Sequence, residues 1–301
     1  MCKFNTDMAD ERVDEYKTTN NLSSIDGIEV TQREYEEFKI TEVNVLNENG
    51  KKSIDKEIGK YITIDVEEIK YIENEKLLIK KINEELEKMI EKDMSILVVG
   101  LGNMYVTPDA LGSKVTKGIE VTRHLLKFGK ELGYKNVREV SCITPGVMGN
   151  TGIETSEIVY AISNIIKPDI IIAIDSLMSK SITRIGSSIQ ISNTGITPGS
   201  GINGVNSSID NNSTNAKVIS IGVPMVVDVK TIINEVDKDN NLNVDELNYI
   251  VTPKDIDDLI EVTSRIISKS INELSYWFFY INILKYIHII QEELIWKKVN
   301  L

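Results

Sequence analysis

Two aspartates stand where carboxyl groups could do chemistry together. Asp109 follows a Gly-x-Gly turn in "VVGLGNMYVTPDALG", and Asp175 ends the almost wholly apolar run "DIIIAID". An acid at the end of a buried strand is costly unless it is hydrogen-bonded or functional. Two carboxyls that share one proton can act as base and acid, because like charge raises one pKa while the other group stays ionised. An acid role for Asp109 requires a second acidic partner of this kind, and Asp175 is the candidate.

The Gly-x-Gly turn has two other interpretations. Gly100 and Gly102 match the first two glycines of a dinucleotide fingerprint, but Tyr105 stands at the third position. Asp109 would also repel the anion that such a turn attracts. The Thr-Pro-Asp sequence at 107–109 is typical of a helix start, where an acid meets the positive end of the helix dipole. The pattern disfavours a phosphate site and leaves a capping role open beside the catalytic one.

Composition narrows the class of protein. The chain has 301 residues and a formal net charge of -12, which argues against a basic surface that neutralises nucleic-acid phosphates. Its 41% hydrophobic residues can form a large folded core. The first residues contain no apolar run typical of a secretion signal. We expect a cytoplasmic protein that binds neither nucleic acid nor membrane directly.

Residues for other catalytic schemes are scarce. The chain has two histidines and two cysteines. None stands in a metal-ligand spacing, and the chain has no Gly-x-Ser-x-Gly elbow. We therefore expect no cofactor and no metal ion.

Strand and helix patterns alternate along the chain and must position the two acids. β-Branched residues alternate at 60–66, and apolar residues recur at helical spacing from 74 to 92. Further apolar runs are "SILVVG", "VREVSC", "DIIIAID" and "KVISIGV", with helical patterns at 109–130, in "ETSEIVYAISNII" and from Pro253. This alternation predicts an α/β fold of βαβ units, with a mostly parallel sheet covered by helices on both faces.

The chain divides into three parts. Residues 1–70 form an N-terminal extension, a smaller β-rich addition, and residues 71–275 form the α/β core. Residues 276–301 form an unusually apolar C-terminal helix, whose interrupted apolar run is short for a membrane span. We expect it at a subunit interface or in the core. The Gly/Ser/Asn-rich stretch 193–215 is expected to be a loop, with a flexible surface loop over 206–215.

Several long motifs, in this order, resemble the germination protease family of spore-forming bacteria: "TDMA", "VVGLGNMYVTPDALG", "VTRHL", "TPGVMGNTGIET", "AIDSL", "ISNTGITPGSGING" and "IGVPMVVD". The resemblance covers about residues 6–272. It implies an endopeptidase that degrades small acid-soluble spore proteins in the germinating spore, made as a zymogen and assembled as a homotetramer. It also implies a three-layer α/β/α core similar to that of hydrogenase maturation proteases.

The same resemblance assigns the site. The acidic pair of the family falls on Asp109 and Asp175. The backbone of the neighbouring loops would support the pair and stabilise a developing oxyanion; the residues are Gly100, Gly102, Asn103, Gly195, Gly199 and Gly201. Substrates of the family are cut after Glu in acidic and apolar stretches, so the acidic N-terminus predicts self-processing near Asn5-Thr6.

Two departures and two alternatives remain. Asn150 and Val205 replace residue types more typical of the family, which affects loop fit or substrate preference.

A metal-dependent maturation-type protease would share the fold and use carboxylates as ligands. A non-catalytic module would use the glycine-rich turns to bind a phosphate or a sugar. Metal analysis, chelation and a cleavage assay separate these alternatives.

Overall fold

The structure is a computed structural model that describes residues 5–128, 137–198, 207–236, 247 and 249–275. The apolar C-terminal segment expected at an interface lies outside these residues, as do Gly199, Gly201 and Val205. In the described part, no helix is both long enough and apolar enough to cross a membrane.

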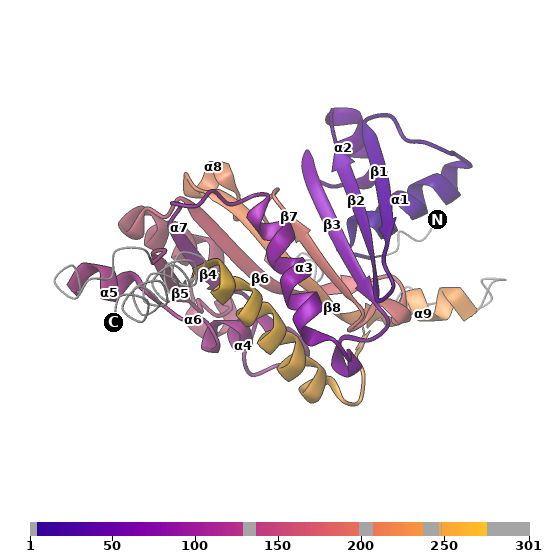
Figure 1. Cartoon of the computed structure of the whole chain (residues 1–301). Helices are drawn as coiled ribbons and strands as arrows, with labels where there is room; N and C mark the ends of the chain where they lie inside the picture. The colour runs from indigo at the N-terminus through magenta and orange to yellow at the C-terminus, as the bar shows by residue number, and fades with distance from the viewer. Residues whose placement is uncertain (1–4, 129–136, 199–206, 237–246, 248, 276–301) are drawn as a thin grey trace, which may run out of the picture.

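One mixed sheet of nine strands runs through the molecule (Figure 1). Its order is β1-β2-β3-β7-β8-β6-β4-β5, and β9 pairs with the far end of β8. The strands are β1 (Ile28–Glu34), β2 (Phe38–Val45), β3 (Gly59–Val66), β4 (Ile96–Gly100), β5 (Val140–Ile143), β6 (Ile170–Ser179), β7 (Ser188–Ser192), β8 (Lys217–Asp228) and β9 (Ile250–Val251).

The central part of the sheet is parallel, as the alternation of strands and helices predicts. β5, β4, β6 and β8 pair in parallel in that order. Residues of β4 and the first part of β6 are buried on both faces of the sheet, which explains their unbroken apolar runs. The carboxyl ends of these strands therefore meet at one edge, where open α/β sheets place their sites.

Helices cover both faces of this sheet. On one face the apolar core joins α3, α4 and the helical segment 256–275 to the strands, and on the other it joins α7 to β4, β6 and β8. Figure 1 shows α3 and the segment 256–275 side by side in front of the sheet. The helices are α1 (Ala9–Asn20), α2 (Glu48–Ile54), α3 (Glu75–Glu87), α4 (Leu111–Lys117), α5 (Arg123–Phe128), α6 (Met148–Thr151), α7 (Thr155–Ile166), α8 (Asn211–Thr214) and α9 (Val229–Val236).

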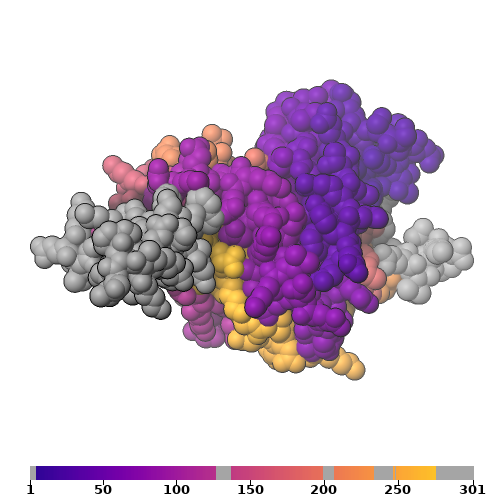
Figure 2. Space-filling model, viewed as in Figure 1, coloured from indigo at the N-terminus to yellow at the C-terminus, as the bar shows by residue number. Residues whose placement is uncertain are grey.

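The N-terminal strands extend the same sheet. β3 pairs with β7, and β2 and β1 continue outward, all antiparallel. α1 and α2 pack on this extension through a small apolar core of their own, which includes Val13, Ile54 and Tyr61. In the space-filling view these elements form one end of the molecule (Figure 2). The strand at 60–66 is confirmed as β3, and the helix expected over 74–92 is confirmed as α3, which ends at Glu87.

Two local expectations are wrong. The helical pattern of 109–130 is broken, because α4 ends at Lys117 and α5 begins at Arg123. Gly118 is the C-cap of α4, and a Cβ atom there would lie 2.6 Å from the Ser268 hydroxyl oxygen, so this close contact favours glycine. In the segment 206–215, the described residues include the short helix α8, which Asp210 caps by accepting the N–H groups of residues 212 and 213.

Candidate active site

Asp175 lies on β6 at the end of its pairing with β4. It is only 7% exposed. Its Oδ1 accepts the N–H of Ser176 at 2.9 Å, and its neighbour on β8 is Gly222. A buried carboxyl with this single backbone donor loses most of its hydration, so the charged form is disfavoured.

The Gly-x-Gly turn brings Asp109 to the same edge of the sheet. The N–H of Leu101 donates to the carbonyl oxygen of Ile174 at 2.8 Å, directly before Asp175. The next residue, Gly102, has φ +89°, and a Cβ atom there would lie 2.1 Å from the carbonyl oxygen of Asp109. Only glycine fits this backbone at this distance. The turn therefore holds one acid against the strand that carries the other.

Asp109 ends a single 3₁₀ turn, η2 (Thr107–Asp109), and does not lie in the first turn of a long helix. Its carboxylate turns back on the chain, where Oδ2 accepts the N–H of Asn103 at 2.8 Å. The sequence-based capping role is thus replaced by a tight loop in which the aspartate is bound by its own upstream backbone. This loop fixes the position of one carboxyl oxygen.

The electrostatics of the two acids are linked. Burial raises the pKa of Asp109 to about 6, against the lowering effect of the Asn103 N–H. Burial, and then the negative charge of Asp109, raise the pKa of Asp175 well above its ordinary value. Because the two charges interact, the pair loses its two protons in separate steps. Across an interval of pH the pair therefore holds one proton.

A third carboxyl lies nearby that the sequence did not single out. Asp7 pairs with Met178 on β6, donating its N–H to the Met178 carbonyl oxygen and accepting the Met178 N–H at Oδ2, both at 2.8 Å. Its charge also raises the pKa of Asp175. The only signal was its place in the "TDMA" motif, because nothing in local periodicity joins residue 7 to residue 178.

The predicted self-processing bond lies beside this pairing. Thr6 is 1% exposed, and its hydroxyl donates to Glu11 and to the Met178 carbonyl oxygen. Glu11 in turn accepts the N–H groups of Lys180 and Ser181. The N-terminal segment is thus bound along the end of the strand that carries Asp175.

The predicted supporting residues separate into three groups. Gly100, Gly102 and Asn103 lie beside the acids, and Gly100 packs against α4, where a Cβ atom would lie 2.2 Å from the Gly112 carbonyl oxygen. Gly195 lies at the base of another loop, closed by a bridge between Ile196 and Ile209. Gly199 and Gly201 fall outside the described residues. The N–H of Asn103, expected for an oxyanion, donates instead to Asp109.

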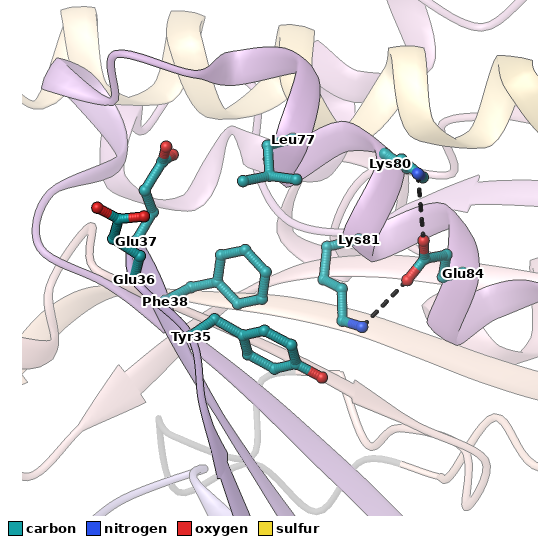
Figure 3. A pocket seen from close by; sticks show the side chains of 8 residues that line it. All are labelled: Tyr35, Glu36, Glu37, Phe38, Leu77, Lys80, Lys81 and Glu84. Carbon is teal, nitrogen blue, oxygen red and sulfur yellow. Dashed lines mark hydrogen bonds and ion pairs between the residues drawn. The ribbon is translucent and has the colours of Figure 1, made fainter.

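A hollow of about 310 Å³ lies away from the two acids, between the β1-β2 turn and α3 (Figure 3). Tyr35 and Phe38 stack with ring centroids 4.6 Å apart, and Lys81 reaches Glu84 at 3.0 Å. Its charged groups largely neutralise one another, and neither acid of the pair lines it. In the described residues, no group of three or more His, Cys, Asp or Glu side chains is placed to share a metal ion.

Comparison with known proteins gives the family. Residues 5–238 match the family model of the germination proteases. The chain is 41% identical to a germination protease of Clostridium tetani, with 89% of this chain and 94% of that protein covered. It is 39% identical to one of Clostridium perfringens strain 13, with 90% and 95% covered.

Among solved structures, a [NiFe] hydrogenase maturation protease HycI from Thermococcus kodakarensis resembles the chain at 17% identity and a TM-score of 0.36. The match covers 63% of this chain and 97% of the maturation protease. The match to the family model spans most of the chain, including the turn that carries Asp109 and the strand that carries Asp175. This chain belongs to the germination protease family of peptidases.

Proposed function

We propose that this chain is an endopeptidase that begins the degradation of small acid-soluble spore proteins during germination, with Asp109 and Asp175 as the groups that activate water. The observation that carries the proposal is the pair of carboxyls on either side of the Leu101-Gly102 turn, Asp175 buried and Asp109 half-buried, both with raised pKa values. Such raised pKa values cluster at functional sites, and a carboxyl pair that shares one proton can supply both the base and the acid of peptide hydrolysis.

The titration order supports a division of roles. Burial and the charge of Asp109 both raise the pKa of Asp175, which favours Asp109 as the ionised group and Asp175 as the group that keeps the proton. In the proposed reaction Asp109 takes a proton from water, whose oxygen attacks the carbonyl carbon of the scissile bond. Asp175 gives its proton to the leaving amine nitrogen as the C–N bond breaks. Proton transfer between the products and the pair restores the starting state.

Cleavage of a small acid-soluble spore protein, mapped by mass spectrometry, tests the proposal. Asp109→Asn and Asp175→Asn should each abolish cleavage, and the double variant should be little worse than either single one, because the two groups act as a unit. Asp257→Asn is the matched control, since Asp257 is exposed on the segment 256–275. Near-normal turnover in either single variant would refute the assignment. Activity that survives chelation separates this mechanism from a metal-dependent one.

We also propose that the chain processes its own N-terminus near Asn5-Thr6. The pairing of Asp7 with Met178 supports this, because it keeps the segment next to the strand that carries Asp175. Cleavage would first require Thr6 to leave its buried contacts. N-terminal sequencing of fully active protein checks the idea, and an intact Met1 or Cys2 would contradict it.

The remaining expectations concern assembly and place of action. We propose a homo-oligomer, a tetramer by analogy with the family, that acts in the cytoplasm of the spore and is made as a zymogen. The division into an N-terminal addition (1–70), a protease core (71–275) and an apolar C-terminal segment (276–301) belongs to the same proposal. Light scattering on the full chain and on a chain truncated after Leu274 measures whether the last segment joins subunits.

A further inference from the structure

Large apolar side chains are exposed on two loops beside Asp109. On the loop between β4 and η2, Tyr105 is 78% exposed, Met104 49% and Val106 47%. On the loop around α6, Met148 is 54% exposed and Ile153 48%. Exposed apolar side chains that gather on neighbouring loops mark an interaction site more often than scattered ones do. We call these five residues the apolar rim.

The two loops of the apolar rim are joined to each other and to the acid pair. The side-chain amide of Asn150 donates to Oδ1 of Asn103 at 3.1 Å. The N–H of the same Asn103 donates to Asp109 at 2.8 Å. One asparagine thus connects the α6 loop, the β4-η2 loop and the carboxylate. A ligand bound on the rim therefore contacts loops that are hydrogen-bonded to Asp109.

The rim is also uncharged in a strongly charged protein. Residues 96–108 and 140–153 contain no Asp, Glu, Lys or Arg, although 27% of the chain is charged. Such a surface offers no ion pair to its ligand and binds by removing apolar area from water. The flexible thioethers of Met104 and Met148 adapt to apolar groups of different shapes.

We propose that the apolar rim binds the apolar side chains of an extended polypeptide substrate next to its scissile bond. The inference rests on the proposed function, because it takes Asp109 as a reacting group. Met104, Tyr105 and Val106 lie on the same loop as Asp109, the proposed reacting group for a peptide bond. A ligand that contacts both is therefore a polypeptide segment. Tyr105 and Met148 are the specificity-determining residues, one on each loop, and Asn150 keeps the loops together.

Peptide binding tests the rim without requiring turnover. The probe is a short fluorescein-labelled peptide with adjacent leucines, compared with the same peptide carrying serines. Fluorescence anisotropy is measured on the full chain and on Tyr105→Ser and Met148→Ser, with Tyr71→Ser as the control. Tyr71 is 63% exposed on η1 (Ile69–Tyr71), outside the rim. Surface substitutions of this kind leave the fold intact, which circular dichroism checks.

The leucine peptide should bind more tightly than the serine peptide, and each rim variant should lose about tenfold in affinity for it, as expected from one large apolar contact. Tyr71→Ser should bind like the unmodified protein. Equal binding of the two peptides, or rim variants that bind normally, would overturn the inference. If a rim variant binds the peptide normally but has a different mass by light scattering, the surface is an interface with a second copy of this chain, and the inference is wrong. If the proposed catalytic role of Asp109 is wrong, a different result shows it: the Asp109→Asn variant still cleaves its substrate.

Discussion

Replacing Asp109 by asparagine should stabilise the protein at neutral pH. Asp109 has its pKa raised from 3.8 to about 6 by burial, so the folded state disfavours the charge that the unfolded chain carries freely. Asparagine is nearly the same shape, has no charge, and can still accept the N–H of Asn103 through its side-chain oxygen. The substitution thus removes a cost of folding and keeps the hydrogen bond.

The magnitude follows from the linkage between proton binding and folding. A shift from 3.8 to about 6 makes the ionised aspartate cost about 3 kcal/mol in the folded state at pH 7. The sign is that of a raised acid: the folded state holds the proton more tightly, so the cost is absent below the unfolded pKa. It grows as pH rises to the folded pKa, and at pH 4 it is only about 0.5 kcal/mol.

Urea unfolding at pH 4 and pH 7, at one fixed protein concentration, measures this difference. Asp109→Asn should raise the free energy of unfolding at pH 7 by about 3 kcal/mol and change it little at pH 4. Asp257→Asn should change it little at either pH, because Asp257 is exposed. A variant that is equally stable to the parent at pH 7, or one stabilised equally at both pH values, would refute the argument from burial.

The loop geometry, the ion pairs of Arg184 and the titration of Asp109 give three further predictions. Gly102→Ala should lower activity and stability sharply in cleavage and urea assays, because the new Cβ would meet the Asp109 carbonyl oxygen at 2.1 Å, whereas Gly149→Ala, with nothing within 4 Å, should be tolerated. Arg184→Met should cost about 3 kcal/mol in urea unfolding, because Arg184 pairs with the buried Asp10 and the half-buried Asp65, and the substitution leaves both carboxylates without their cation. The control Arg265→Met, at an exposed arginine whose partner Glu75 keeps Lys269 as a second cation, should cost at most about 1 kcal/mol, and an equal effect of the two would contradict the burial argument. The acid limb of the pH profile of kcat/KM should lie near pH 6, since below it both carboxyls are protonated; a limb near the ordinary value of 3.8 would exclude Asp109 as the base.

Local periodicity predicted the elements whose environment is uniform. The strand at 60–66 and the start of the helix expected over 74–92 follow from local apolar spacing, although β3 is buried on both faces over Tyr61–Ile64 and α3 ends at Glu87. The apolar run before Asp175 was predicted as a strand in the same way, but β6 continues past Asp175 to Ser179, and Asp175 lies where the pairing of β6 with β4 ends. The helix start expected at Asp109 is instead a 3₁₀ turn.

Features that depend on distant partners were not predictable from local pattern. Gly118, directly after the end of α4, lies against Ser268, which is far away in sequence. The approach of Asp7 to β6 depends on a pairing between residues 171 positions apart. The hydrogen bond of Asn150 to Asn103 joins two loops whose separation in sequence carries no periodic signal. In each case the sequence contains the residue, but local pattern does not predict which distant residue it contacts.

The pairing of β3 with β7 has a consequence for how the chain folds during synthesis. Tyr61 lies opposite Ser192, so the N-terminal strands leave the ribosome long before the strand that completes their edge. Until then the apolar residues Ile62 and Ile64, buried in the finished protein, lack most of their core. Contacts so distant in sequence form slowly, and an open strand edge can pair with other chains in the meantime. The nascent chain should therefore depend on chaperones most strongly while residues 67–187 are being made.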